Sequence, residues 1–298
     1  MECPFVSVIV PVLNDARRLD GCLAALERQT YPPDRYEVRV VDNGSTDGSG
    51  DVVARFPHTL LAHEREAGSY AARNRGIALA RGDVLCFTDA DCIPADDWLA
   101  AGTRAVEQTS GRGVVGGRVE LFYRTPGQPT ACELYETVFD FDQERFVTAG
   151  RFAMTANLFT TAAVIRHVGR FDARLKSAGD REWGNRAHAA GHPLSFASHV
   201  LVRHPARLLF HEILAKRVRV AGGHHDISRR ARFPSVHLLA ALSQQLLRKP
   251  ARAALRLSRW RGPGGPVTRL GSWGVLVALC WAEAGERVRL HAVDRERR

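Results

Sequence analysis

The sequence predicts an α/β fold, because short apolar strands alternate with amphipathic helices through residues 5–91. The apolar run at 83–88 ends abruptly at two carboxylates, Asp89 and Asp91, which is typical of a buried strand that stops at a functional edge. The chain of 298 residues, 45% hydrophobic and 25% charged, is also long enough to bury a substantial core. Strands separated by helices pair in parallel through right-handed crossovers, so the loops after the strands should meet at one edge of the sheet.

Each expected element has a local reason. Alternating or continuous apolar residues predict the strands, helical spacing predicts the helices, and the segment 42–47 combines turn-forming with helix-capping residues. The elements expected here are, in order, strand 6–10, helix 16–29, strand 36–41, a helix that ends near 56, strand 59–62, helix 69–80 and the strand that ends at Asp89.

The carboxylates Asp89 and Asp91 would repel each other unless a cation lay between them. Hard divalent cations prefer oxygen ligands, and magnesium-type sites combine one or two carboxylates with phosphate oxygens. The pair therefore indicates a metal-bridged diphosphate in a nucleotide-binding α/β layer. The alternative is two solvated loop acids.

Four segments together resemble the family 2 glycosyltransferases of GT-A fold. They are VSVIVPVLN (6–14), VDNGSTD (41–47), AARNRG (71–76) and TDAD (88–91), and the resemblance extends over roughly residues 5–225. It implies a Rossmann-like mixed sheet flanked by helices, a UDP- or GDP-sugar donor, Mn2+ or Mg2+, an acceptor with a free hydroxyl, and inversion at the anomeric carbon.

The resemblance also implies a set of residues that bind the donor nucleotide. These are Pro11, Asn14, Asp42, Asn43, Arg73 and Asp89. The Asp42 carboxylate only accepts hydrogen bonds, so it suits a uracil imide or a ribose hydroxyl; the alternative is a turn-forming residue. Arg73 would contact the nucleotide or diphosphate unless it is an exposed helical arginine. Gly76 is expected to allow close packing rather than ligand contact.

The general base is expected in the segment 175–186. Family members carry Glu-Asp there, and this chain has Gly179 followed by Asp180, which makes Asp180 the candidate and Glu182 its rival. The base would take the proton of the acceptor hydroxyl as that oxygen attacks. His204 is a further candidate metal ligand beside Asp89 and Asp91, with a hydrogen-bonded structural histidine as the alternative.

The positive charge is concentrated in the last quarter of the chain. Residues 229–298 hold 15 Lys and Arg against 4 Asp and Glu. We therefore expect a catalytic domain over 1–228, with a donor half at 1–118 and an acceptor half at 119–228, followed by a basic helical extension over 229–298. The apolar stretch 270–281 is too short to span a membrane. The adjacent histidines at 224–225 are expected in a loop.

Basic residues interleaved with tryptophans in this extension suit an anionic membrane surface. The alternative is a set of helices packed on the catalytic domain with a solvated basic face; nucleic-acid binding is not expected. The six cysteines show no paired spacing, and no leader peptide is visible. These features predict a cytoplasmic protein, peripheral on the inner face of the plasma membrane.

The predicted function is metal-assisted, inverting transfer of a sugar from a nucleoside-diphosphate sugar to an acceptor hydroxyl. Cell-envelope polysaccharide, glycolipid and specialised glycoside synthesis are the expected settings. One alternative is a nucleotidyltransferase, which would need a glycine-rich triphosphate loop where this chain has Pro-Val-Leu-Asn at 11–14. The other is a non-catalytic membrane-surface adaptor.

Overall fold

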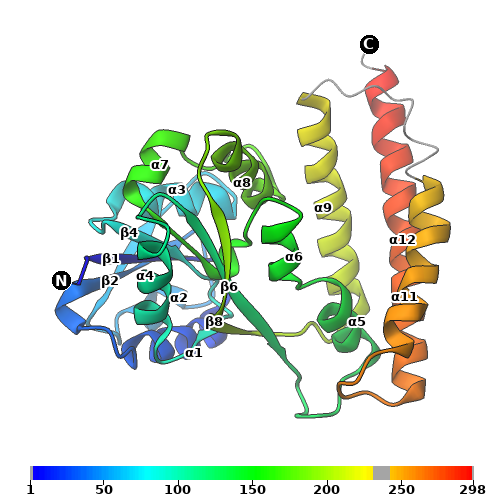
Figure 1. Ribbon diagram of the computed structural model, residues 1–298, viewed down its shortest axis with the longest axis horizontal. Helices are drawn as coiled ribbons and strands as arrows, with labels where there is room; N and C mark the ends of the chain where they lie inside the picture. Colours follow the sequence, from blue (N-terminus) through cyan, green and yellow to red (C-terminus); the bar gives the residue numbers. More distant parts are fainter. Residues whose placement is uncertain (1–2, 231–241, 297–298) are drawn as a thin grey trace. The chain divides into compact units, whose positions relative to one another are not determined.

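The computed structural model describes residues 3–230 and 242–296 and contains a mixed eight-stranded sheet (Figure 1). The strands lie in the order β3 (Thr59–His63), β2 (Tyr36–Asp42), β1 (Val6–Val12), β4 (Val84–Phe87), β7 (Leu158–Thr161), β6 (Val114–Phe122), β8 (Leu194–Pro205) and β5 (Ile93–Pro94). The first four are parallel, whereas β7 runs antiparallel to both β4 and β6. The predicted α/β fold with a mixed sheet is confirmed, and each strand predicted in residues 5–91 is present.

Helices flank this sheet (Figure 1). They are α1 (Ala16–Glu27), α2 (Ser49–Val53), α3 (Ser69–Leu79), α4 (Trp98–Glu107), α6 (Gln143–Thr148), α7 (Ala162–Val168) and α8 (Gly179–Ala189). The predicted second helix is shorter than expected, since α2 ends at Val53. Helix α3 packs on β1 and β2. A Cβ at Gly76 would lie 2.5 Å from the Ile9 side chain, which confirms the packing role of this glycine.

One buried side chain, Asn157, joins several strands behind the candidate site. Its amide donates to the carbonyls of Arg118 and Val200, both at 2.9 Å, and its carbonyl oxygen accepts from the Trp98 indole at 2.9 Å. The neighbouring Ala156 carbonyl accepts from the Thr88 hydroxyl at 3.0 Å. The loop after β4, which carries the two carboxylates, therefore starts from a fully buried anchor.

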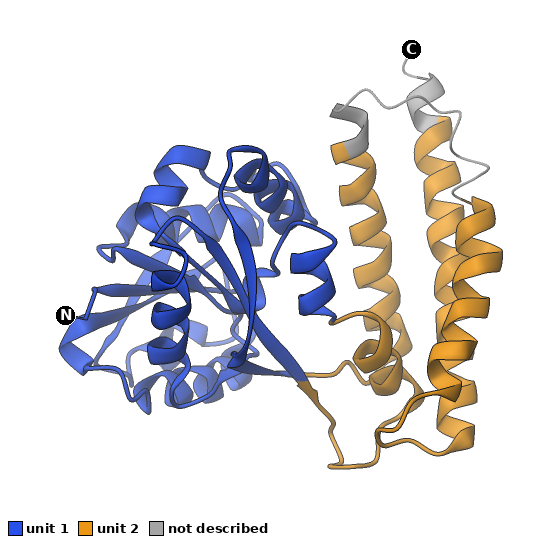
Figure 2. Cartoon of the chain, viewed as in Figure 1, with its two compact units in different colours: residues 1–120, 142–204 blue, residues 121–141, 205–298 orange. Residues whose placement is uncertain are grey.

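The chain folds into two compact units, each built from two separate stretches of sequence (Figure 2). Unit 1 comprises residues 1–120 and 142–204, and unit 2 comprises residues 121–141 and 205–298. The boundary that we predicted at 228 falls within the helix Phe210–Arg230. Unit 2 therefore contains the basic extension together with residues that we assigned to the acceptor half.

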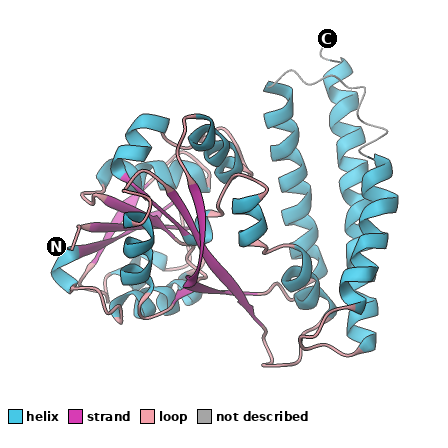
Figure 3. Ribbon diagram, viewed as in Figure 1, coloured by secondary structure: helices cyan, strands magenta, loops and turns pink. Residues whose placement is uncertain are grey.

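The described residues of unit 2 are mainly helical (Figure 3). Its α-helices are α5 (Ala131–Phe139), α9 (Phe210–Arg230), α11 (Lys249–Ser258) and α12 (Pro266–Glu296). Both α5 and α9 pack against α12. The loop predicted at 224–225 is wrong, since both histidines lie within α9.

Buried ion pairs join the helices of unit 2. Glu136 of α5 lies 3.1 Å from the Lys216 ammonium of α9, and Asp140 lies 3.0 Å from Lys216 and 3.2 Å from the Arg217 guanidinium. Arg217 also pairs with Glu283 of α12. Because these acids are almost inaccessible to water, each depends on its cation for charge compensation.

The basic extension is helical where the structure describes it. The predicted helical pattern begins at 238, and its residues 238–241 lie outside the described residues. A π-helical turn at Gln244–Arg248 then leads into α11, in which Pro250 occupies the first turn, where a proline is tolerated. Within the described ranges, every helix is too short or too polar to cross a membrane.

Candidate functional site

Several of the predicted site residues lie at or just after the carboxyl ends of three neighbouring parallel strands. Pro11 lies within β1 opposite Val41, and Asp42 is the last residue of β2. Asp89 and Asp91 follow β4. The crossover topology brings the loops after β1, β2 and β4 to one edge of the sheet, as the sequence predicts.

The loops after β1 and β2 are tied to each other. Asn14 adopts a left-handed backbone conformation with φ 52°, which asparagine tolerates better than most residues. Its side-chain oxygen accepts from the Thr46 amide at 2.8 Å, and its own amide donates to the Ser45 hydroxyl at 2.9 Å. Asp42 accepts from the Ser45 amide at 2.9 Å. The turn role considered for Asp42 is thus real, and its second oxygen lies 3.6 Å from His63.

Asn43 connects the loop after β2 to the approach to α3. Its side-chain NH2 donates to the carbonyls of Glu64 and Glu66 at 2.9 and 2.7 Å, and its oxygen accepts from the Gly68 amide at 2.7 Å. Both polar atoms of this side chain therefore hold the loop.

Arg73 is buried, with only 5% of its side chain exposed, so the exposed-arginine alternative is wrong. From α3 its guanidinium donates to Asp89 and lies 5.6 Å from the centre of the Tyr70 ring. The Asp89 side chain is one third exposed. Arg73 consequently compensates one carboxylate of the Asp89–Asp91 pair and fixes its orientation.

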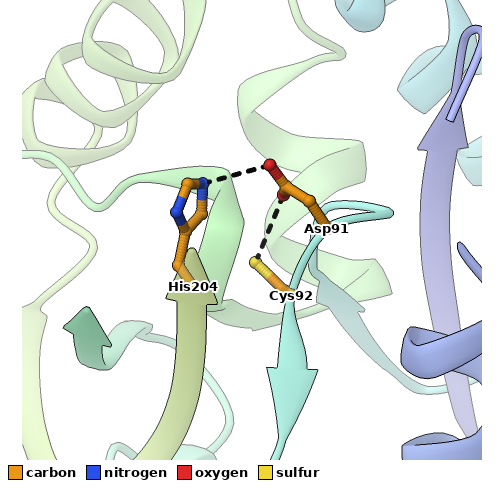
Figure 4. Close-up of side chains that lie close together, drawn as sticks. All are labelled: Asp91, Cys92 and His204. Carbon is orange, nitrogen blue, oxygen red and sulfur yellow. Dashed lines mark hydrogen bonds and ion pairs between the residues drawn. The ribbon is translucent and has the colours of Figure 1, made fainter. Parts of the chain in front are cut away.

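Asp91 lies between a histidine and a cysteine (Figure 4). Its Oδ2 is 3.4 Å from Nε2 of His204 on β8, and its Oδ1 is 3.9 Å from Sγ of Cys92. Ligand atoms of the three residues lie within 4.8 Å of one another, a grouping that suits a metal ion. Burial, with the charges of Asp91 and Asp89, raises the pKa of the Cys92 thiol well above its ordinary value. Hard divalent cations prefer oxygen ligands to sulfur, so Asp91 and His204 are the better ligand pair of this group.

Asp180 begins α8 and is held by Tyr70 of α3. The Tyr70 hydroxyl donates to Asp180 Oδ1 at 3.4 Å and accepts from the Asp180 amide at 3.3 Å, and the Arg181 amide donates to the same carboxylate oxygen at 2.9 Å. Burial raises the pKa of the Asp180 carboxyl despite the opposing effects of the Arg181 amide and the Arg73 charge. A continuous line of contacts therefore runs from Asp180 through Tyr70 and Arg73 to Asp89.

The Glu182 side chain is bound to Arg186 and not to the residues around Asp180. Its carboxylate pairs with Arg186 one turn later on α8, at 2.7 and 3.0 Å. The same guanidinium donates to the carbonyls of Val168 and Arg170. Glu182 is thus one member of a clamp between α8 and the loop after α7.

Tyr70 is the site residue that sequence reasoning missed. A Cβ at Gly179 would lie 2.7 Å from the Tyr70 ring, so the space where the resemblance leads one to expect a glutamate side chain is taken by a tyrosine from α3. Two features of the sequence could have indicated Tyr70. A glycine at 179 implies that another group fills the space of the expected side chain, and Tyr70 lies one helical turn before Arg73.

Comparisons with known proteins bear on the family and the fold of the chain. The family model described as "Glycosyl transferase family 2" matches residues 7–159. The chain is 42% identical over 225 residues to "Glycosyltransferase AglE" of Haloferax volcanii, covering 74% of this chain and 73% of the relative.

Two solved structures show the same fold at low sequence identity. "Mannosyltransferase PcManGT from Pyrobaculum calidifontis in complex with GDP-Man and Mn2+" is 21% identical, with a TM-score of 0.67 over 97% of this chain and 88% of the other. The S. aureus TarS fragment 1-349 in complex with UDP is 17% identical, with a TM-score of 0.55 over 99% and 92% of the two chains.

Proposed function

Because the chain belongs to glycosyl transferase family 2 and transfers sugar from a nucleotide sugar, we propose that it performs one inverting displacement with Asp180 as the general base. The observation that carries the proposal is the connected line from Asp180 through Tyr70 and Arg73 to Asp89. It relates the candidate base to the candidate donor-binding groups through contacts within one compact unit.

The donor is proposed to be a UDP- or GDP-sugar bound at the edge formed by the loops after β1, β2 and β4. Asp42 would accept a hydrogen bond from the base or ribose, and Asp89, oriented by Arg73, would contact the ribose or diphosphate. Asn14 and Asn43 act by holding the loops. Support comes from the two structures of similar fold, one of which is a complex with GDP-Man and the other a complex with UDP.

Asp91 and His204 fit a divalent cation, with Asp89 as a further oxygen donor on the same loop. Imidazole nitrogen combined with carboxylate oxygen suits Mn2+ better than Mg2+, which prefers oxygen alone. When bound there, the cation neutralises charge that develops on the departing nucleoside diphosphate. His204 is 5% exposed and is held in β8, so this part of the site is preformed.

Asp180 would act on the acceptor. It takes the proton of the acceptor hydroxyl while that oxygen forms a bond to the anomeric carbon, and the bond from that carbon to the diphosphate breaks with its electron pair on the leaving oxygen. A carboxylate whose pKa is raised by burial is a better base near neutral pH than an ordinary aspartate. The commitment of Glu182 to Arg186 supports this choice of base.

The basic helices of unit 2 support a peripheral location at an anionic membrane surface. Such a location, on the cytoplasmic face, suits synthesis of a cell-envelope polysaccharide or a glycolipid, with a specialised glycoside as a further product class. The attraction of each basic residue to an anionic leaflet is about 1 kcal/mol near the surface.

The test of the catalytic proposal is ligand-dependent thermal stabilisation of the full chain. UDP, GDP and CTP are each added with Mn2+ or with EDTA, to the wild type, to Asp91→Asn and to Asp96→Asn. Asp96 is a matched control because its side chain is 62% exposed and paired only at 3.5 Å with Arg28. A ligand at 100 times its Kd stabilises by about 2.7 kcal/mol, which is easily measured.

We expect stabilisation by one nucleoside diphosphate that requires Mn2+, is retained in Asp96→Asn and is lost in Asp91→Asn. Equal stabilisation of the wild type in EDTA would refute the metal assignment. A response to CTP or another triphosphate alone would refute the proposed donor class.

A further inference from the structure

Unit 2 contains an arginine-lined surface pocket of about 560 Å3, remote in sequence from the candidate catalytic residues. Its walls come from α11 and the turn that follows. They include Arg252, Leu255, Arg256, Arg259, Trp260 and Arg261. Neither the family match, which ends at residue 159, nor the catalytic proposal assigns a role to this pocket.

Helical geometry places the arginines on one side of α11. Arg252, Arg256 and Arg259 recur at intervals of four and three residues, which brings them onto one face. Ala253 and Leu257 each follow one of these arginines in sequence, so they lie on an adjoining side of the helix, where they are buried, with exposed fractions of 4% each. The apolar face therefore fixes the rotation of the helix and turns the arginine face to solvent.

Trp260 gives the pocket a fixed wall. Its indole N–H donates to the Pro263 carbonyl at 3.0 Å, and its ring packs against the buried cluster that contains Leu134 and Leu257. A Cβ at Gly262 would lie 2.4 Å from this ring, so the turn can close over the indole only with glycine there. The wall is therefore set by packing in the absence of a ligand.

Three of the four pocket arginines lack internal charge compensation. The sequence has no acidic residue between Asp226 and Glu283. Within residues 3–230 and 242–296, no carboxylate forms an ion pair with Arg252, Arg259 or Arg261. The interior cations of the same unit, in contrast, are matched with buried acids. Uncompensated guanidinium groups around one hollow attract an anion, and their planar forks match phosphate oxygens.

Apolar side chains accompany this charge at the surface of unit 2. Leu255, in the pocket itself, is 52% exposed. Val267, Leu270 and Trp281 of α12 are 85%, 70% and 63% exposed, and their spacing places them on one face of that helix. Exposed apolar residues in the same unit as an arginine-lined hollow are better suited to a lipid than to a free anion.

We propose that this pocket binds the phosphate of an anionic phospholipid headgroup. The guanidinium groups of Arg252, Arg256, Arg259 and Arg261 surround the phosphate, while exposed apolar residues of unit 2 enter the interface between headgroups and acyl chains. This inference rests on the membrane association proposed above and identifies the lipid group to which unit 2 binds.

The experiment is sedimentation of the full chain with vesicles of phosphatidylcholine, with or without phosphatidylglycerol, at low and high salt. The pocket variant is Arg252→Gln/Arg259→Gln. The control, Arg104→Gln/Arg166→Gln, removes the same charge at two exposed positions of unit 1. A third variant, Arg252→Lys/Arg259→Lys, keeps the positive charge but removes the planar guanidinium groups.

We expect the wild type and the control to bind the anionic vesicles but not the neutral ones. The pocket variant should bind about 30-fold more weakly, which corresponds to two basic residues at a lipid surface. The lysine variant should lose part of the affinity, because a point charge does not reproduce bidentate phosphate binding.

The possible failures are distinguishable. If no form binds anionic vesicles, membrane association itself is refuted. If the pocket variant binds as well as the control, association stands and the pocket assignment is refuted. Thermal stabilisation by glycerol 3-phosphate without vesicle binding would show that the ligand is a soluble phosphate. Binding of a single-stranded oligonucleotide in place of vesicles would show that the ligand is a nucleic acid. Either result overturns the proposal.

Discussion

Adding one methyl group at Gly179 should slow the enzyme about 100-fold without unfolding it. The new Cβ would lie 2.7 Å from the Tyr70 ring, whereas ordinary contacts begin near 3.4 Å, so the ring or the start of α8 must move by about 0.7 Å. The Tyr70 hydroxyl meets Asp180 at 3.3 and 3.4 Å, already near the limit of a hydrogen bond, and a shift of this size breaks both contacts.

The expected magnitude follows from the cost of misplacing a catalytic group. A displacement of about 1 Å lowers the rate by about 100-fold, or about 2.7 kcal/mol of transition-state stabilisation. Gly179→Ala should therefore reduce kcat/KM by roughly that factor. Affinity for the nucleoside diphosphate should stay close to that of the wild type, since the substitution acts on the base and not on the donor.

The assay is steady-state kinetics at varied acceptor concentration, with donor affinity and thermal stability measured on the same samples. Gly21→Ala is the matched control, because Gly21 is an exposed helical glycine with no atom within 4 Å of the added Cβ. It should keep full activity and gain up to about 1 kcal/mol of stability. A folded Gly179→Ala with unchanged kcat/KM would show that Tyr70 does not position Asp180.

Three further predictions concern the base, its pH dependence and the helical unit. Asp180→Asn should lower kcat by about 10²–10⁴-fold with donor affinity unchanged, whereas Glu182→Gln should stay active. Initial rates and a donor titration test this prediction. An inactive Glu182→Gln with an active Asp180→Asn would show that Glu182 is the base. Burial raises the pKa of Asp180, and the base acts in its deprotonated form. The value of kcat/KM should therefore rise with pH, with a midpoint above the ordinary pKa range of aspartate. A pH–rate profile without this rise would contradict the prediction. Arg217→Met should cost about 3–5 kcal/mol in urea unfolding by leaving buried acids uncompensated, while Arg248→Met, at an exposed position, should cost little. Burial raises the pKa of Asp140, but Lys216 and Arg217 outweigh it and hold the pKa below its ordinary value, so this stabilisation is lost as the pH falls through that pKa.

The donor-side architecture was predictable because its signals are local. A strand, its turn and the polar residue at its end lie within about ten residues of sequence, and parallel topology then brings such ends together. The burial of Arg73 was not predictable in this way. Helical spacing identifies a face of a helix, but the depth of that face depends on Asp89 and Tyr70, which are placed by the tertiary fold.

The parts that were missed depend on contacts between distant segments. Tyr70 and Asp180 are 110 residues apart, so no spacing rule connects them. The loop expected at 224–225 was inferred because adjacent histidines do not share one face of a helix, but α9 continues through both of them and packs against α12. The extension was likewise treated as separate because its composition differs, although Arg217 and Glu283 join α9 to α12 through a buried ion pair.

The interleaving of the two units has a consequence for how the protein is made. Asp140 and Arg217 are 77 residues apart, and at about 5–20 residues per second a ribosome needs about 4–15 s to synthesise the stretch between them. Residues 142–204, which complete unit 1, emerge during that interval, whereas α5 still lacks α9 and α12. Unit 1 should consequently fold first during translation, and unit 2 only when the last helix is released. A nascent chain that stalls before α12 would present the unpaired acids and apolar face of α5, a surface by which chaperones and proteases distinguish an unfinished polypeptide from a completed one.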